Sequence, residues 1–384
     1  MLYDLAAPCH FGVEAVVKRE LQDLGYEITG TRDGRVDFRA DPAGVVRADI
    51  SLRTPERVLL RVGRFRAQTW DELFEGVKAL PWEEFIPRDA RFWVTKAVSV
   101  RSKLFSPSDI QRIVKKAMVD KLAVKYGLAH FPETGEPWPV RVFILNDEVD
   151  VCLDTTGDSL HKRGYRKTNV MAPVAENLAA ALIMLTPWKA DRILVDPFCG
   201  SGTFVIEAAM MAAHIAPGIH RSFTAEKWNS IFPENLWKEA RREAYAAIDT
   251  DVETDLQGYD KDPAAVDVAR LAAEEAGVDE MVHFQVRDVS DLSHRKKYGF
   301  IITNPPYGMR IGGDDDASLA ALYRTLGERY RGLDDWSMFI LSAYPGTENA
   351  IGKSDKNRKI YNGMIETRFY QYFGAKPPAR ERRI

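Results

Sequence analysis

Two short segments of this 384-residue chain combine glycine, proline, aspartate and asparagine in patterns that could do chemistry. The first, residues 195–204, reads Val-Asp-Pro-Phe-Cys-Gly-Ser-Gly-Thr-Phe and lies between an apolar strand and a helix expected over 205–213. Glycines let the backbone approach a ligand closely, and the exposed amides at the start of a helix favour a carboxylate or phosphate. A dinucleotide could use such a loop, but the third glycine of Gly-x-Gly-x-x-Gly is absent, and no acid ends a second strand about 20 residues later. The segment therefore predicts a cofactor site that differs from a dinucleotide site.

The second segment, residues 303–308, reads Thr-Asn-Pro-Pro-Tyr-Gly and follows an apolar strand. An amino group on a purine ring is a poor nucleophile because its lone pair is delocalised into the ring. Two acceptors, Asn304 Oδ1 and the Pro305 carbonyl, could draw that nitrogen toward tetrahedral geometry and free the lone pair. The proline pair stiffens the loop, and Tyr307 offers a face on which a planar base can stack. We therefore expect transfer to an exocyclic amine, catalysed by Asn304, Pro305, Pro306 and Tyr307.

Alternating strands and helices position both segments. From residue 169 onward, apolar strands are expected at 192–195, 256–259, 282–286, 300–303 and 336–342. This alternation predicts parallel strands joined by crossover helices in an open doubly wound sheet, in which ligands bind at the carboxyl ends of the strands. Asp260 and Asp288 end two of these strands and join the same edge. Residues 214–254 form an insertion that carries Trp228 and Trp237, and we assign it no role.

The first 155 residues predict two smaller α+β units. Residues 1–55 contain a helix over 14–24 and a half-buried strand over 35–39. Residues 56–155 contain strands over 57–66 and 92–100, a helix capped by Ser106, and a hairpin over 140–145 and 149–153. One face of that helix is apolar, and the basic residues expected to face away from it are Arg112, Lys115 and Lys116.

A polar, basic segment, residues 156–170, separates these units from the doubly wound region expected over 171–384. It holds one aromatic residue among basic ones, a combination suited to phosphate contact beside a stacked base. The residues concerned are Lys162, Arg163, Tyr165 and Arg166. A solvated linker would have the same composition, so this second interpretation stays open.

Several of these segments resemble known families. Residues 102–106, Ser-Lys-Leu-Phe-Ser, followed by 109–117, resemble the core of a THUMP domain, an RNA-binding module that follows a ferredoxin-like unit in its family. Residues 171–384 resemble the methyltransferase domain of the bacterial large-subunit ribosomal RNA guanine-N2 methyltransferases. Together these resemblances cover nearly the whole chain.

The resemblance implies S-adenosylmethionine as the cofactor. Gly200 and Gly202 would approach its methionine moiety, and Asp196 would contact the amino end. Asp260 would accept hydrogen bonds from the ribose hydroxyls, and Asp288 would accept one from the adenine amino group. The implied cofactor-binding set is Asp196, Phe198, Gly200, Gly202, Thr203, Asp260, Asp288 and Asn304. Because the sulfonium already activates the methyl group, positioning could supply most of the rate.

The resemblance also points to RNA as the partner. Residues 160–166 and 172–178 resemble motifs that link the two domains in rRNA and tRNA guanine-N2 enzymes, and residues 358–363, before a strand expected over 366–372, resemble the rRNA-methylating members. One departure is Met309, where several relatives carry glutamate. The implied substrate-binding set is Ser102, Lys103, Arg112, Lys115, Lys116, Lys162, Arg163, Tyr165 and Arg166.

Composition limits the other possibilities. The net charge is −3, so an RNA-binding surface must be a local patch. The three cysteines form no Cys-x-x-Cys pair and no metal-ligand spacing, so we expect no metal and a reducing, cytoplasmic location. The longest apolar stretch, residues 178–185, is too short to span a bilayer, and we expect no membrane contact.

These observations predict an α/β protein with a Rossmann-like S-adenosylmethionine methyltransferase domain, preceded by α+β ferredoxin-like (1–55) and THUMP (56–155) domains. The expected reaction is methylation of guanine N2 in 23S rRNA, and a tRNA guanine-N2 methyltransferase of the same architecture is the closest alternative. DNA adenine-N6 methylation shares the Asn-Pro-Pro-Tyr motif, although an RNA-binding module is out of place there. A non-catalytic RNA-binding factor in ribosome assembly is a further alternative, against which the intact Asp196, Gly200, Gly202 and Asn304 argue.

Overall fold

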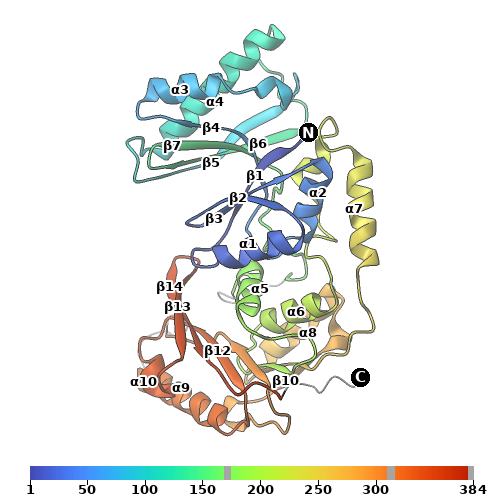
Figure 1. Cartoon of the computed structure of the whole chain (residues 1–384), viewed down its shortest axis with the longest axis vertical. Coiled ribbons are helices and arrows are strands. Elements are labelled where there is room, and N and C mark those ends of the chain that lie inside the picture. Colours follow the sequence, from blue (N-terminus) through green and yellow to red (C-terminus); the bar gives the residue numbers. More distant parts are fainter. Residues whose placement is uncertain (168–173, 309–315, 379–384) are drawn as a thin grey trace. The chain divides into compact units, whose positions relative to one another are not determined.

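The computed structural model describes residues 1–167, 174–308 and 316–378. Contacts divide the chain into two compact units (Figure 1). Unit 1 comprises Met1–Pro8, Lys18–Leu160 and Arg221–Glu243, and unit 2 comprises Cys9–Val17, His161–His220 and Ala244–Ile384. Each unit therefore takes in a segment that lies, along the sequence, within the other.

Unit 1 is built on one seven-stranded sheet with the order β2-β3-β1-β4-β7-β6-β5. The ferredoxin-like and THUMP halves share this sheet, because β1 pairs with β4 through Leu5 opposite Leu60 and Ala6 opposite Leu59. All pairings are antiparallel except that of β5 with β6. The strands are β1 (Tyr3–Pro8), β2 (Glu27–Arg32), β3 (Arg35–Ala40), β4 (Leu59–Arg66), β5 (Arg91–Val100), β6 (Pro137–Leu145) and β7 (Glu148–Asp154).

The helices of unit 1 begin at residues that the sequence marks for capping. Asp41, Thr69 and Ser106 each accept a hydrogen bond from a backbone amide of the first turn that follows. In Figure 1, α3 and α4 lie along strands β4 to β7. The α-helices are α1 (Glu14–Asp23), shared between the units, α2 (Pro42–Ser51), α3 (Trp70–Lys78) and α4 (Pro107–Tyr126), and η1 (Trp82–Glu84) is a 3-10 turn.

The two faces of this sheet differ in polarity. Leu5, Leu60 and Leu153 are in register across β1, β4 and β7 and are fully buried. Successive side chains of a strand point to opposite faces, so Arg61 and Asp150 belong to the other face. We call this second face the polar face.

Residues 221–243 of the insertion pack on the sheet of unit 1. The ring of Trp228 stacks on Trp138 of β6 with centroids 4.1 Å apart, and its Nε1 donates a hydrogen bond to the Pro137 carbonyl at 2.8 Å. Phe232 contacts the ring of Tyr3 edge-on. This part of the insertion, to which the sequence assigned no role, therefore contributes to the hydrophobic core of unit 1. It contains η2 (Thr224–Lys227) and most of α7 (Glu234–Ala246).

Unit 2 contains the predicted doubly wound sheet, with the order β10-β9-β8-β11-β12-β14-β13. The first five strands are parallel, and β14 is antiparallel to both β12 and β13. The predicted Rossmann-like fold is confirmed, and the parallel strands lie within two residues of their expected positions. The strands are β8 (Leu194–Asp196), β9 (Leu256–Asp260), β10 (Val282–Val286), β11 (Phe300–Thr303), β12 (Ser337–Ser342), β13 (Lys356–Asn362) and β14 (Ile365–Tyr372).

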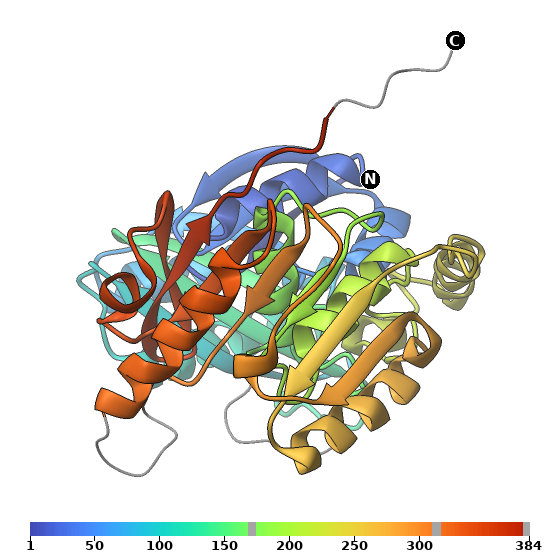
Figure 2. The ribbon, with the colours of Figure 1, turned by 90° about the horizontal axis from the view of Figure 1, so that it is seen from below.

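The core of unit 2 explains why strands and helices alternate there. Val195, Ile301 and Ile340 pack in one buried cluster with Leu319, Tyr323 and Leu326 of α9, while α6 and α8 contact β8 and β9 (Figure 2). Strands with apolar residues on both faces are typical of a parallel sheet. The helices are α5 (Glu176–Leu185), α6 (Thr203–Ala212), α8 (Pro263–Ala276), α9 (Asp316–Arg331) and α10 (Thr347–Ile351), with 3-10 turns η3 (Asp279–Met281) and η4 (Val289–Asp291).

The described parts of the chain contain neither a membrane-spanning helix nor a group of metal-binding side chains. None of their helices has the length and apolar character needed to cross a membrane. Nor do three or more His, Cys, Asp or Glu side chains come together there in a group that could hold a metal ion.

Candidate functional site

The glycine loop joins β8 to α6 and leaves open space above its first glycine. Gly200 and Gly202 have φ angles of 51° and 78°, which favour glycine. A Cβ at Gly202 would lie 2.7 Å from the ring of Phe284, whereas a Cβ at Gly200 would meet no atom within 4 Å. The loop is closed by the Cys199 amide, which donates to the Tyr259 carbonyl at 2.8 Å. Gly202 thus packs inward, and Gly200 faces space that a ligand can fill.

Asp196, Asp260 and Asp288 lie at the carboxyl ends of the neighbouring strands β8, β9 and β10, as predicted. Asp260 Oδ2 accepts a hydrogen bond from the Gly200 amide at 3.0 Å, which ties the second strand to the glycine loop. Asp288 caps η4 by accepting from the Ser290 amide at 2.8 Å, and hydrogen bonds from Ser290 lower the pKa of Asp288. Both of these aspartates are thus held as carboxylate acceptors at one edge of the sheet.

Asp196 is the most buried of the three, with 1% of its surface exposed. Its Oδ1 accepts hydrogen bonds from the Thr303 hydroxyl at 2.5 Å and from the Phe198 amide at 3.1 Å. Burial raises the pKa of Asp196 to about 7, although these hydrogen bonds act in the opposite direction. Thr303, which the sequence reasoning did not select, links the end of β11 to the end of β8.

Asn304 directly follows β11 and is 9% exposed. Its Oδ1 is buried, and among the described residues it has no hydrogen-bond partner. A buried acceptor without a partner costs about 1–3 kcal/mol, so such an atom in a native site needs an explanation. An amine hydrogen of a bound substrate would supply the missing donor.

Tyr307 differs from its expected role. It is 7% exposed and belongs to the same buried cluster as Tyr323 and Tyr344. Little of its ring surface is therefore available for a stacked base, because the ring fills the core beneath α9. Met309, the departure noted in the sequence, lies outside the described residues, as do residues 168–173, which contain the start of the predicted domain at residue 171.

The basic segment requires a correction at two of its four residues. Arg163 and Tyr165 are buried, and both contact Glu207 in the middle of α6, Arg163 Nε at 3.3 Å and the Tyr165 hydroxyl at 3.1 Å. A buried carboxylate needs a paired cation, and Arg163 supplies it. These two side chains therefore face the interior of unit 2 and do not offer a surface for RNA. The acid within the apolar run of α6 was the sequence signal that could have indicated this partner.

Arg166 and Lys162 differ from that pair. Arg166 Nη2 donates to the Thr203 hydroxyl at 2.7 Å, and Nη1 lies 3.5 Å from Glu176 Oε1. Thr203 is the first residue of α6, so Arg166 anchors the start of the helix that follows the glycine loop. Lys162 is exposed.

The THUMP-like residues lie in unit 1 on the loop after β5 and on α4. The Ser102 hydroxyl accepts from the Asp147 amide at 3.0 Å, and the Lys103 amide donates to the Asp147 carboxylate at 2.8 Å. Arg112 and Lys116 are exposed, as predicted. Lys115 was expected to face away from the sheet, but its Nζ lies 3.7 Å from the ring centre of Phe92 in β5 and pairs with Glu133 at 2.7 Å.

The site of unit 2 fits S-adenosylmethionine. Open space above Gly200 allows a close backbone approach, and the carboxylates of Asp260 and Asp288 can accept hydrogen bonds from ribose and from an amino group. The buried Asn304 Oδ1 follows the adjacent strand β11. Ligands of doubly wound sheets bind at this edge.

Comparisons with known proteins agree with this geometry. The family model described as RMKL-like, methyltransferase domain matches residues 163–371, the RlmL ferredoxin-like domain matches 4–59, and the THUMP domain matches 67–154. The chain is 42% identical to YpsC of Bacillus subtilis, a proposed RNA methyltransferase, over 99% of this chain and 98% of YpsC.

Two further relatives add detail. A ribosomal RNA large subunit methyltransferase K/L of Syntrophotalea carbinolica is 33% identical over 96% of this chain, which spans only 54% of that longer protein. The crystal structure of SMU.472, a proposed methyltransferase complexed with SAH, superimposes with a TM-score of 0.91 at 40% identity, covering 98% of this chain and 99% of SMU.472. The expected ferredoxin-like, THUMP and methyltransferase domains are confirmed by these matches, and the chain belongs to the RMKL-like methyltransferase family.

Proposed function

We propose that the protein transfers the methyl group of S-adenosylmethionine to the N2 amino group of a guanine in 23S rRNA, in the cytoplasm. The observation that carries this proposal is the buried Oδ1 of Asn304, which has no hydrogen-bond partner among the described residues and lies at the sheet edge that also holds Asp196, Asp260 and Asp288. The SAH bound by SMU.472 supports the cofactor, and the RNA named for YpsC and for the K/L enzyme supports the substrate class.

The chemistry follows from the acceptors at the end of β11. Asn304 Oδ1 accepts one hydrogen of the guanine amino group, and the Pro305 carbonyl accepts the other. These two hydrogen bonds pull the nitrogen out of the plane of the ring and localise its lone pair for attack. When bound, S-adenosylmethionine would supply an activated methyl group: the N–C bond would form as the C–S bond breaks, S-adenosylhomocysteine would leave, and the guanine nitrogen would lose one proton to solvent. Positioning by the stiff Asn-Pro-Pro loop provides most of the rate in this scheme.

Asp260 and Asp288 hold the cofactor, and Asp196 contacts its amino end. Exposed basic residues of the THUMP half, Arg112 and Lys116, contribute phosphate contacts. Lys162, on the surface of unit 2, is a further candidate for such a contact. Arg163, Tyr165 and Arg166 act on α6 and the cofactor loop and have a positioning role.

Nucleoside analysis by mass spectrometry tests the reaction. A strain that lacks this gene should lose N2-methylguanosine from 23S rRNA, and wild type should restore it whereas Asn304→Ala should not. Loss of the same nucleoside from tRNA instead would assign a tRNA substrate, and loss of N6-methyladenine from DNA would assign the DNA reaction. Unchanged nucleosides together with no binding of S-adenosylmethionine would indicate a non-catalytic RNA-binding factor.

A further inference from the structure

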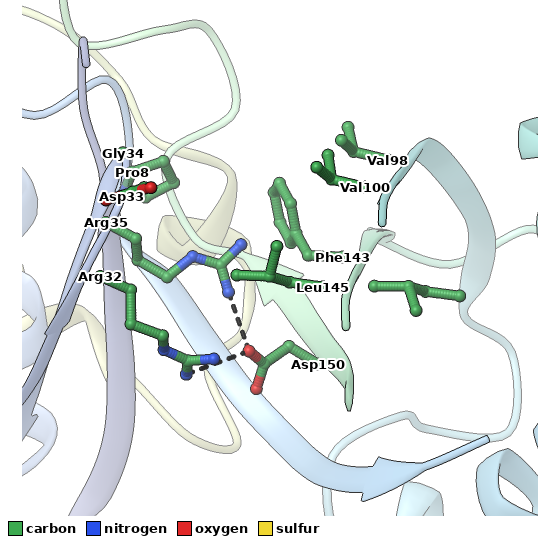
Figure 3. Close-up of a pocket in the computed structure, with 11 residues that line it drawn as sticks. Pro8, Arg32, Asp33, Gly34, Arg35, Val98, Val100, Phe143, Leu145 and Asp150 are labelled. Carbon is green, nitrogen blue, oxygen red and sulfur yellow. Dashed lines mark hydrogen bonds and ion pairs between the residues drawn. The ribbon is translucent and has the colours of Figure 1, made fainter. Parts of the chain in front are cut away.

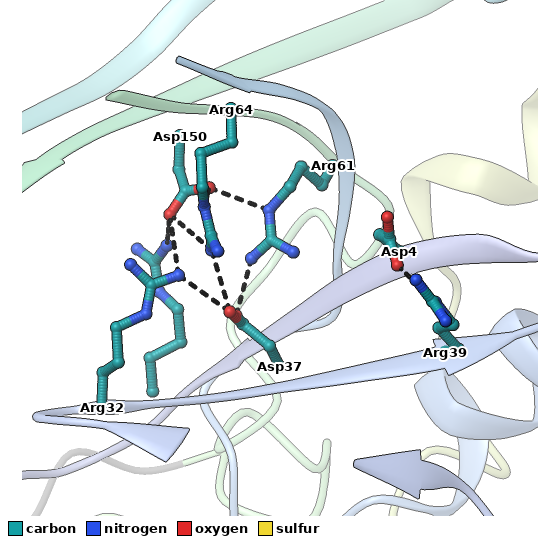
Figure 4. A network of polar contacts seen from close by, with 8 residues as sticks. Asp4, Arg32, Asp37, Arg39, Arg61, Arg64 and Asp150 are labelled. Carbon is teal, nitrogen blue, oxygen red and sulfur yellow. Dashed lines mark hydrogen bonds and ion pairs between the residues drawn. The ribbon is translucent and has the colours of Figure 1, made fainter. Parts of the chain in front are cut away.

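Four arginines gather around two buried carboxylates on the polar face of the first sheet (Figure 4). We call this group the arginine cluster, and none of its members was selected from the sequence. Asp150 Oδ1 accepts hydrogen bonds from Arg61 Nε at 2.8 Å and from Arg64 Nε at 2.7 Å, and its Oδ2 lies 3.0 Å from Arg35 Nη1. Asp37 accepts from Arg61, Arg32 and Arg64 at 2.7, 2.8 and 2.9 Å. The members are Arg32, Arg35, Arg61, Arg64, Asp37 and Asp150.

The cluster carries more positive than negative charge. Its four guanidinium groups face two carboxylates, and both carboxylates are about 95% buried. A carboxylate offers about four acceptor positions, whereas each guanidinium has five N–H donors, so the two aspartates cannot satisfy all four arginines. The side chains of Arg32 and Arg64 remain 29% and 34% exposed, and their unused donors can reach an additional anion.

This arrangement is unfavourable for stability alone. Arg32 and Arg35 stand directly opposite each other across the tight β2–β3 turn, and like charges in that position repel. A buried charged network seldom adds net stability when compared with apolar packing. What the buried carboxylates do provide is a fixed orientation for the planar guanidinium groups, which suits recognition of phosphate.

A cavity of about 220 Å³ adjoins the cluster (Figure 3). Arg32, Arg35 and Asp150 form its polar side, and the ends of β5 and β6 form an apolar side with Val98, Val100, Phe143 and Leu145. The guanidinium of Arg35 stacks over the ring of Phe143 at 4.0 Å. The exposed carboxylate of Asp33 also lines the cavity, and its negative charge opposes the binding of an anion there.

We propose that the arginine cluster binds phosphates of a single-stranded segment of the substrate RNA, and that the adjoining cavity receives one of its unpaired bases. Unpaired bases can be splayed out against apolar and aromatic surfaces, which a duplex cannot do. The inference rests on the proposed function, because it takes RNA to be the partner. It adds an anchor on the sheet face to the exposed basic residues of the THUMP half.

Binding of a fluorescent single-stranded RNA 12-mer to the full chain, measured by anisotropy over a salt series, tests the proposal. The double variant Arg32→Gln/Arg64→Gln should bind about tenfold more weakly or worse. Its plot of log affinity against log salt should be shallower by roughly 1.4, since each single-strand phosphate contact contributes about 0.7. The control is Arg39→Gln, which removes one positive charge from the same face. Arg39 is already paired with Asp4 at 2.8 Å and lies near Glu27 at 3.7 Å, and the control should stay within twofold of wild type.

Asp33→Asn removes a negative charge instead of a positive one, and it leaves the paired carboxylates of Asp37 and Asp150 unchanged. It should strengthen RNA binding severalfold, and a duplex of the same sequence should show a smaller gain. If Arg32→Gln/Arg64→Gln binds RNA as tightly as the Arg39→Gln control does, the proposed role of the arginine cluster in RNA binding is refuted. The proposed methyl transfer would not be affected by that result. If the double variant unfolds or loses S-adenosylmethionine binding, the RNA affinity of Asp33→Asn is the test. An RNA affinity of Asp33→Asn equal to that of wild type would overturn the proposal. A wild-type chain that binds no RNA would overturn both this inference and the RNA substrate.

Discussion

Replacing Asp196 by asparagine should remove a pH dependence from both the stability of the protein and its affinity for the cofactor. Asp196 is 1% exposed, and burial raises its pKa to about 7 from an ordinary value of 3.8. The amide of asparagine keeps an oxygen that can accept the hydrogen bond from Thr303, but it cannot ionise. A comparison of the two proteins therefore isolates the charge of this one side chain.

The direction of the stability effect follows from the raised pKa. Asp196 favours the folded state fully below pH 4, and this contribution is lost as the pH rises through 7, because the folded protein resists ionisation there. A difference between pKa values of 3.8 and about 7 corresponds to about 4 kcal/mol, at about 1.36 kcal/mol for each pH unit. Asp196→Asn should accordingly raise the free energy of unfolding relative to wild type by about 4 kcal/mol at pH 8, and by less than half of that at pH 5. Urea unfolding of both proteins at the two pH values measures this difference.

Asp196→Asn should weaken cofactor binding, although it should raise the free energy of unfolding. If Asp196 contacts the amino cation of the cofactor, binding needs the ionised carboxylate, and wild-type affinity should rise about fivefold between pH 6 and pH 7 before levelling off. Asp196→Asn should bind more weakly and show no such rise. Calorimetry with S-adenosylhomocysteine, which has the same amino-acid end, gives both affinities. Equal affinities for the two proteins at every pH would refute the contact, and a stability difference independent of pH would refute the raised pKa.

Three further variants test other parts of the site. Asn304→Ala should abolish methyl transfer and leave cofactor affinity within a few-fold, because its contact to the amine matters most in the transition state; single-turnover transfer of labelled methyl to RNA is the assay, and substantial activity would contradict the role. Asp260→Ala should weaken cofactor binding, since each lost charged hydrogen bond is worth roughly 1.5–3 kcal/mol and the Gly200 amide also loses its acceptor. Calorimetry measures the cofactor affinity, and an unchanged value would show that Asp260 does not bind the cofactor. Glu207→Gln should lower the free energy of unfolding by about 3–5 kcal/mol, because the buried guanidinium of Arg163 loses the carboxylate with which it is paired, and a smaller loss in urea unfolding would show that the pair is relaxed by water.

The methyltransferase half could be predicted in detail because its signals are local. Three of the five parallel strands, β8, β9 and β11, end at or are directly followed by an acid or an asparagine, namely Asp196, Asp260 and Asn304. The strand β13 was missed because most of its residues are polar or charged and its side chains are largely exposed. It forms at the edge of the sheet by pairing with β14, a contact that periodicity does not reveal.

Roles that depend on distant partners could not be predicted. Arg163 looked like a surface residue because its neighbours are basic, yet its partner Glu207 lies 44 residues further along the chain. Asp150 joins the arginine cluster with Arg32, which is 118 residues away. A single sequence shows charge and spacing along the chain, whereas the tertiary fold decides which charges meet.

The insertion changes how the two halves of the chain can be separated experimentally. A fragment of residues 171–384 would contain all the residues that the sequence predicts to bind the cofactor. In the structure Trp228 and Phe232 of that fragment are buried in unit 1, where Trp228 stacks on Trp138. Cutting the chain before residue 171 would expose both rings, and burial of an aromatic side chain contributes several kcal/mol. Variants of the full chain are therefore the sound way to divide RNA binding from catalysis.

The buried contacts of residues 163–166 explain why the side chains of this basic motif are largely shielded from solvent. Glu207 sits in the middle of α6, whose first residue, Thr203, directly follows the glycine loop. Arg163 and Tyr165 neutralise and hydrogen-bond this carboxylate, and Arg166 holds the Thr203 hydroxyl, so the motif fixes α6 at its start and at its middle. A helix held at two points keeps its first turn, and with it the open space above Gly200, in a constant position. The motif that suggested RNA contact thus belongs, by its own hydrogen bonds, to the support of the cofactor site.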